Sequence, residues 1–203
     1  TQNNRIIHIR RSGAQNMREH ISIIANNCWG AEVYKRYNLP FSTPVIGLYF
    51  YPDCFLKLVQ NIDVYFKSEL TFTKRSNYFE GAVSYPIGVV KDIEVHFLHY
   101  ENEEEAKEKW TKRCLRINQD RAKVFYKFDD RDGANKAHLD AFLNLNLPNS
   151  ICFSKYAISH PNHVFIPMEK DAVSVIDGLK LFYVSERFFD LDAWLAGNGV
   201  VRR

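Results

Sequence analysis

The chain has 203 residues, of which 46% are hydrophobic, with 27 Lys and Arg against 24 Asp and Glu. This much apolar surface can build one substantial core, which excludes a disordered tail or a small disulfide-stapled protein. The net charge of +3 creates no strong positive field, so we expect no nucleic-acid partner.

Two strand–helix units open the chain. Apolar runs at residues 21–25 and 45–50 predict two strands. Residues 29–37 are compatible with a helix, and residues 52–66, which begin with Pro and Asp, carry apolar side chains at helical spacing. The order of elements is therefore strand, tight loop, helix, and then the same again.

A strand with alternating character is predicted next, at residues 93–100. Its alternation places Glu94 and His96 on the same face. Asn102, followed three residues later by a glutamate, predicts the start of a helix that runs to about Ile117.

Strands and helices alternate through the second half of the chain. Strands are predicted at 124–128, 150–153 and 164–166, and helices at 136–144 and 190–195. This alternation with short connections predicts an α/β fold, a single three-layer α/β/α domain over residues 1–203 with a largely parallel or mixed sheet. The turn-rich residues 154–180 predict an irregular cap or an antiparallel extension.

In such folds ligands bind beyond the carboxyl ends of the strands, and the first loop there is Asn26-Asn27-Cys28-Trp29-Gly30. A thiol at the start of a helix has a lowered pKa, which predicts Cys28 as a nucleophile. Alternatively, Cys28 is a small buried hydrophobe and the two asparagines only cap the helix. In a third interpretation Asn26, Asn27, Trp29 and Gly30 bind a phosphate or carboxylate of the substrate through the helix amides.

A cysteine nucleophile needs a base, and His96 is the candidate, with Glu94 beside it on the same strand face. Asp129 would complete a Cys28–His96–Asp129 catalytic set by orienting the imidazole. The sequence does not place these three residues together, so their convergence is the observation that decides between an enzyme and a domain with unrelated polar loops.

The loop Asp129-Asp130-Arg131-Asp132 follows the predicted strand 124–128. Asp130-x-Asp132 has the spacing of a short acidic motif that holds a divalent ion, Mg²⁺ or Mn²⁺, on a nucleotide diphosphate. Arg131 then contacts the substrate. The alternative is a solvated turn whose acids cap the following helix.

The four cysteines, at positions 28, 54, 114 and 152, form no CxxC pair, which predicts free thiols. No apolar run approaches the roughly 18 residues that would span a bilayer. We therefore expect a cytoplasmic protein that is not transmembrane.

Six segments resemble a bacterial family of unknown function, DUF1919. They are residues 24–34, 39–48, 85–88 and 92–100, the Glu-rich stretch that follows through Trp110, and residues 127–132. Members of that family are often described as exopolysaccharide or capsule biosynthesis proteins. The resemblance implies work on nucleotide-linked or lipid-linked sugars and transfers no catalytic residue to this chain.

Two functions of different classes follow. The first is a transferase, or a thiol-dependent acyl-transfer or hydrolytic enzyme, that acts on a sugar-linked or phosphorylated small molecule. The alternative is a non-catalytic protein of the same pathway that binds a sugar phosphate or a partner enzyme. The sequence predicts no oligomeric state.

Overall fold

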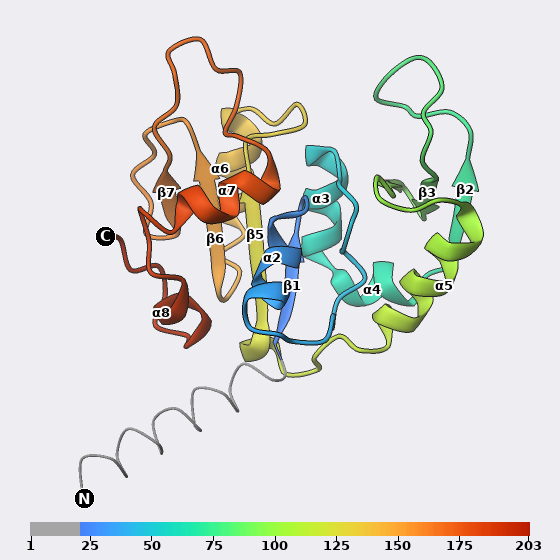
Figure 1. Ribbon diagram of the computed structural model, residues 1–203, viewed down its shortest axis with the longest axis horizontal. Coiled ribbons are helices and arrows are strands. Elements are labelled where there is room, and N and C mark those ends of the chain that lie inside the picture. Colours follow the sequence, from blue (N-terminus) through green and yellow to red (C-terminus); the bar gives the residue numbers. More distant parts are fainter. Residues whose placement is uncertain (1–20) are drawn as a thin grey trace, which may run out of the picture.

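The structure is a computed structural model that describes residues 21–203. Its centre is a four-stranded sheet built from β1 (Ser22–Ala25), β5 (Val124–Asp129), β6 (Ser150–Ser154) and β7 (His163–Phe165). The strands lie in the order β1-β5-β6-β7, and every neighbouring pair is parallel (Figure 1). The predicted α/β fold with a largely parallel sheet is confirmed.

Helices cover both faces of this sheet. On one face lie α2 (Trp29–Arg36) and α7 (Gly178–Ser185), which pack against each other, and on the other lie α3 (Pro52–Gln60) and α6 (Lys136–Asn144). The short helix α8 (Leu191–Leu195) closes the first of these layers. The arrangement gives the three predicted layers.

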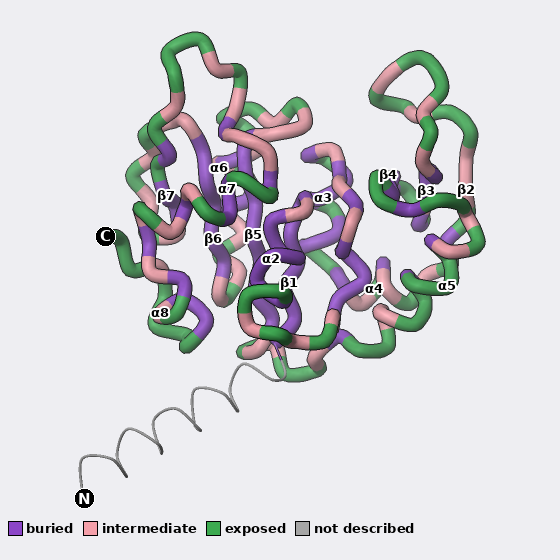
Figure 2. Tube along the Cα trace, viewed as in Figure 1, coloured by how far each residue is buried: buried purple, intermediate pink, exposed green. Residues whose placement is uncertain are grey.

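Successive residues of the central strands feed two separate cores. On β1, Ile23 belongs to the core under α2 and α7, whereas Ile24 belongs to the core under α3 and α6. Phe125 and Tyr126 of β5 divide in the same way. Because neighbouring side chains of a strand point to opposite faces, strands covered on both sides are buried along their length, as the purple centre of Figure 2 shows, and most of their side chains are apolar.

A second, antiparallel sheet lies beside the first. It consists of β2 (Leu70–Thr73), β3 (Ile87–Val90) and β4 (Ile93–His96) in that order, with α5 (Glu103–Cys114) packed against it. Figure 1 shows these elements on the far side of β1 from β6 and β7. The chain reaches them through α4 (Ile62–Lys67) and returns to the central sheet through the 3-10 turn η1 (Arg121–Lys123).

One extended segment joins the two sheets. The backbone of Tyr49 exchanges two hydrogen bonds of 3.0 Å with His96 at the end of β4. The next residue, Phe50, donates its N–H to the carbonyl oxygen of Asn26, just after β1, at 3.0 Å. Tyr49 and Phe50, which are consecutive in the chain, thus connect the end of β4 to the end of β1 by hydrogen bonds.

Three predicted elements are corrected. Residues 45–50 form no strand and contribute only the Tyr49–His96 bridge, because Gly47 turns the chain with a φ of 70°. The helix predicted at 52–66 is two helices, since Asn61 ends α3 and its side chain accepts from Val64 N to start α4. The strand predicted at 93–100 ends at His96, where the N–H of Leu98 turns back to the His96 carbonyl.

Three elements were not predicted from the sequence. They are β2, β3 and α7. Within residues 154–180, β7 pairs in parallel with β6 and so continues the main sheet. None of the helices within residues 21–203 combines the length and apolar character needed to cross a membrane.

Candidate functional site

The carboxyl ends of β1 and β5 meet in a group of four buried polar side chains, which we call the strand-end cluster: Asn26, Asn27, Lys127 and Asp129. Their exposed fractions are 1%, 6%, 0% and 0%. The parallel register pairs Ala25 with Lys127, so the asparagines that follow β1 lie beside the last residues of β5. The sequence folds this way because both strands are apolar up to these residues.

The strand-end cluster is closed on itself by hydrogen bonds. Lys127 Nζ donates to Asn26 Oδ1 at 3.1 Å, to Asn27 Oδ1 at 3.0 Å and to Asp129 Oδ2. The Asp129 carboxylate also accepts from Asn26 Nδ2 at 2.9 Å and from Asn27 Nδ2 at 2.8 Å. A buried ion pair is tolerated only when its remaining polar atoms are bonded, and here they are.

Burial lowers the pKa of the Lys127 ammonium, and the neighbouring Asp129 opposes that effect. Burial would raise the pKa of the Asp129 carboxyl, but Lys127 and the two asparagine amides hold it below its usual value. For both groups burial disfavours the charged form and the partner favours it. Asp129 was predicted as catalytic. In the structure its carboxylate accepts hydrogen bonds from the loop that follows β1.

Cys28 lies half-buried at the cap position of α2. Burial raises the pKa of its thiol, while Lys127 and Lys35 act in the opposite direction. The expectation of a lowered thiol pKa is therefore wrong: desolvation outweighs the helix end, and Cys28 is a neutral thiol at neutral pH. Its role as a nucleophile stays a prediction.

The next two residues of the predicted loop point into the protein. Trp29 is fully buried, with its ring against Phe153, Phe182 and Trp194. At Gly30 a Cβ would lie 3.1 Å from Ala25 Cβ, so the glycine allows α2 to pack closely on β1. Both positions are accounted for by packing, and their predicted contact with substrate remains untested.

Asp130 and Arg131 tie the loop after β5 to its neighbours. The Asp130 carboxylate accepts from Val175 N at 2.9 Å and from Lys155 N at 3.1 Å, and Arg131 donates to the Val175 carbonyl at 3.0 Å. Residues 21–203 contain no group of three His, Cys, Asp or Glu side chains that could hold a metal ion. The divalent ion on Asp130 and Asp132 stays a prediction.

Asp132 differs from the other acids of this loop. It is half-buried in a left-handed backbone conformation with a φ of 56°, and no described residue forms a hydrogen bond or ion pair with its carboxylate. Burial, reinforced by Asp129, raises the pKa of Asp132 to about 6. The Asp132 charge contributes to the raised pKa values of Cys28 and Tyr51.

A second cluster lies at the junction of the two sheets, and we call it the tyrosine–histidine cluster: Tyr49, Tyr51, Tyr85, Glu94 and His96. The Tyr49 ring stacks on the imidazole at a centroid distance of 4.7 Å, and Tyr51 meets it edge-on at 5.2 Å. The Tyr85 hydroxyl lies 2.8 Å from that of Tyr49 and 3.5 Å from His96 Nδ1. The three tyrosines are half-buried, whereas His96 is fully buried.

His96 Nε2 lies 3.3 Å from Glu94 Oε2, yet it has no hydrogen-bond partner among residues 21–203. Burial lowers the pKa of His96, and Glu94 opposes this shift. Ser76 and Asn77, in the loop before β3, hold the Glu94 carboxylate with bonds of 2.6–2.7 Å. The carboxylate that accompanies His96 is therefore Glu94, as the strand alternation predicted, and Asp129 lies in the other cluster.

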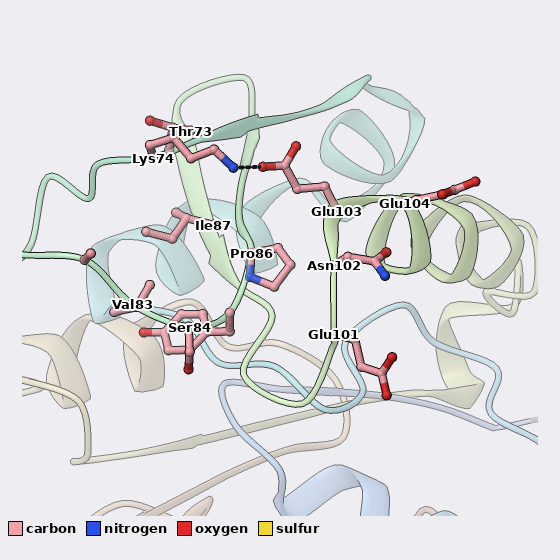
Figure 3. A pocket seen from close by; sticks show the side chains of 12 residues that line it. Thr73, Lys74, Val83, Ser84, Pro86, Ile87, Glu101, Asn102, Glu103 and Glu104 are labelled. Carbon is pink, nitrogen blue, oxygen red and sulfur yellow. Dashed lines mark hydrogen bonds and ion pairs between the residues drawn. The ribbon is translucent and has the colours of Figure 1, made fainter.

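A cavity of about 550 Å³ lies on the outer side of Tyr85. It is formed between the loop before β3 and the start of α5, and the ion pair of Lys74 with Glu103, 2.5 Å long, spans it (Figure 3). Tyr85 lines the cavity, while its hydroxyl reaches Tyr49 and His96. This side chain connects the cavity with the tyrosine–histidine cluster.

The predicted site residues thus fall into two neighbouring groups. Cys28 and the loop after β5 belong to the strand-end side, and His96 with Glu94 belongs to the second sheet. Tyr51 belongs to the second group through its ring contact with His96, and the charges of Asp132 and Glu94 both raise the pKa of its hydroxyl. The charges that act on the pKa of Cys28 are those of Lys127, Lys35, Asp132 and Glu32.

Sequence reasoning missed Lys127, Tyr49 and Tyr51. A lysine inside the apolar run Val124–Phe128 was a readable signal, because a charge in a strand covered on both faces needs a buried partner. Tyr49 and Tyr51 gave no such signal. Their contact with His96 depends on the antiparallel bridge between distant segments.

Comparison with known proteins adds a family. A family model described as "Domain of unknown function (DUF1919)" matches residues 2–195. An uncharacterised protein of Haemophilus influenzae is 37% identical over 134 residues, which make up 66% of this chain and 61% of that relative. The chain therefore spans less than two thirds of the relative's length.

Proposed function

The chain belongs to the DUF1919 family, and we propose that it is a transferase that acts on a sugar-linked substrate and uses Asp132 for proton transfer. The observation that carries this proposal is the state of the Asp132 carboxyl. It is half-buried, bonded to no described residue, and has its pKa raised to about 6 at the carboxyl edge of a parallel sheet.

A general acid or base works best when its pKa lies near the pH of the reaction, because both protonation states are then populated. Asp129 and Asp130 do not meet this condition, since their oxygens accept hydrogen bonds that fix the loop. Asp132 is the acid of this loop that remains available to a ligand. A perturbed, unpaired carboxyl of this kind is typical of a functional site.

We propose Cys28 and Tyr51, whose pKa values the Asp132 charge raises, as the side chains that contact the substrate beside Asp132. As a neutral thiol, Cys28 is a weak nucleophile, so direct proton transfer by Asp132 is favoured over a thiol-dependent acyl transfer. The half-buried rings of Tyr49, Tyr51 and Tyr85 offer apolar faces and hydroxyls, which suit a sugar ring.

The substrate class rests on the resemblance to proteins of exopolysaccharide and capsule biosynthesis. We therefore propose a nucleotide-linked or lipid-linked sugar in the cytoplasm. Mg²⁺ or Mn²⁺ on Asp130 and Asp132 is an alternative role for Asp132, because a carboxylate that binds a metal ion does not exchange protons. Binding of that ion would weaken the hydrogen bonds that Asp130 accepts from two backbone N–H groups. We therefore expect weak metal binding and a requirement for added Mg²⁺ or Mn²⁺ in the assay.

The test is turnover of a panel of uridine, guanosine and cytidine diphosphate sugars, with and without Mn²⁺, followed by chromatography of the released nucleotide. The expected result is product formation that Asp132→Asn lowers by about 10²–10⁴-fold, the usual contribution of a general acid or base. Asp171→Asn, at an exposed position, is the matched control and should keep full turnover. Absence of turnover throughout the panel, or equal turnover by Asp132→Asn, would contradict the proposal.

A binding protein without turnover is the second candidate, and the tyrosine–histidine cluster favours it. Its tyrosine rings and the adjoining cavity provide a surface for a sugar phosphate without requiring chemistry at Asp132. In the same panel, a rise in melting temperature with no product would support this function.

A further inference from the structure

We propose that the strand-end cluster forms a covalent cross-link, an isopeptide bond between the side chains of Lys127 and Asn27 with release of ammonia. The cluster holds the three groups that such a reaction needs: an amine, an amide and a carboxyl group that bridges them. All three are enclosed at the junction of β1 and β5, with exposed fractions of 6% or less.

The amine and the amide are in contact. Lys127 Nζ lies 3.0 Å from Asn27 Oδ1. The amide carbon is one C=O bond, about 1.23 Å, from that oxygen. The nucleophilic nitrogen is therefore at van der Waals distance or slightly beyond it from the carbon that it must attack, and reacting groups held so closely gain large effective concentrations.

Asp129 is placed to move the protons. Its Oδ2 atom accepts a hydrogen bond from Lys127 Nζ, the nitrogen that must lose a proton, and one of 2.8 Å from Asn27 Nδ2, the nitrogen that must gain one. A single oxygen thus touches both ends of the transfer. Burial lowers the pKa of Lys127, which increases the share of the neutral amine that can attack.

The carbonyl oxygen of Asn27 is also provided for. It accepts from Trp29 N at 3.3 Å in addition to Lys127, so a backbone donor remains to stabilise the negative charge that develops during attack. A Cβ on Gly178 would lie 2.6 Å from this oxygen, which shows how closely α7 encloses the amide. The indole ring of Trp29 lies 6.0 Å from Lys127 Nζ and helps to exclude water.

Asn26 has a different part in the cluster. It accepts from Lys127 Nζ at 3.1 Å and donates to Asp129 Oδ1 at 2.9 Å. It therefore holds both groups in place, but it touches the carboxylate oxygen that Lys127 does not use. The geometry selects Asn27 as the reacting amide.

The reaction balances without a cofactor or an oxidant. The bond between Lys127 Nζ and Asn27 Cγ forms, and the bond between Asn27 Cγ and Nδ2 breaks. Of the three protons on the lysine ammonium, one stays on the new amide, one is relayed by Asp129 to the departing nitrogen, which leaves as ammonia, and one stays on Asp129.

The test is the intact mass of the purified full chain under denaturing conditions, followed by mapping of its tryptic peptides. The expected mass is lower than the sequence mass by one ammonia molecule, and the digest should contain a branched peptide that joins Asn27 to Lys127. The unmodified sequence mass would overturn the proposal, and so would an ammonia loss that maps to an asparagine other than Asn27.

Three variants sharpen this result. Lys127→Arg removes the nucleophile and Asp129→Asn removes the proton relay, so both should show the full sequence mass. Asp130→Asn changes the neighbouring carboxylate in the same way and should keep the ammonia loss. If the first two variants do not fold, the presence or absence of the branched peptide in the chain without substitutions still decides the question. The outcome does not depend on whether Asp132 supports turnover.

Discussion

The strand-end cluster and the tyrosine–histidine cluster are connected through Tyr49 and Phe50. Each contains a buried ionisable pair, but the two pairs differ in how completely they are hydrogen-bonded. In the strand-end cluster, Lys127 and Asp129 bond to each other and to two asparagines. In the tyrosine–histidine cluster, His96 Nε2 faces Glu94 without a hydrogen bond, and half-buried tyrosines form its border.

This difference separates structural from available polar groups. A fully bonded buried network holds the chain in one arrangement, and its members have no atoms left for a ligand. Groups that are buried but incompletely bonded raise the free energy of the folded state, which is common where a protein binds or reacts with something else. By this criterion Lys127 and Asp129 position the loops, whereas His96 and Asp132 remain available.

The largest expected effect is at Lys127. Lys127→Met removes the nitrogen that joins Asp129 and both asparagines, in the ion pair and in the proposed cross-link alike, so we expect a loss of about 3–5 kcal/mol in the free energy of unfolding, measured by urea titration. Lys109→Met, which breaks an exposed pair with Glu105, is the control and should cost less than about 1 kcal/mol. Similar losses in the two variants would remove the basis of the comparison.

A smaller effect is expected in the tyrosine–histidine cluster. Glu94→Gln retains the shape of the side chain but weakens its bonds to Ser76 and Asn77, so a loss of about 1–3 kcal/mol is expected. Because those bonds hold the loop before β3, limited proteolysis should cut this loop faster in the variant. Glu69→Gln, at an exposed position, serves as the control. An unchanged cleavage rate would show that Glu94 does not hold the loop.

The sequence was sufficient for the regular part of the fold. The helices α2, α5 and α6 and the strands β1, β5 and β6 are encoded by local periodicity and caps, such as the Asn102 and Asn135 side chains that start α5 and α6. The antiparallel sheet was not accessible in this way. Its strands have four residues each, and their pairing depends on contacts between distant segments.

The candidate site was predicted in its parts but not in its arrangement. The sequence named the Cys28 loop, the His96–Glu94 pair and the acidic loop after β5, and the pairing of His96 with Glu94 followed from strand alternation. It did not distinguish Asp132 from Asp129, because the difference lies in Lys127 and two asparagines that reach Asp129 only in the folded chain. The pKa of the Cys28 thiol was predicted in the wrong direction for the same reason, since burial of the thiol depends on tertiary packing.

The smallest of these effects separates the two kinds of acid within one loop. The folded-state pKa of Asp132 is about 6 against a reference of 3.8, so between these pH values the folded chain binds more protons than the unfolded chain. The contribution of Asp132 to stability therefore falls as the pH rises through this window and is least favourable above it. Asn tolerates the left-handed backbone of this position as Asp does. We therefore expect Asp132→Asn to stabilise the chain by about 1–2 kcal/mol at pH 8 and to leave its stability near pH 3 unchanged. Urea titrations at the two pH values measure this. A variant that gains stability at pH 8 while losing turnover identifies Asp132 as a residue kept for function at a cost in stability, whereas destabilisation at pH 8 would place its carboxylate among the structural groups with Asp129.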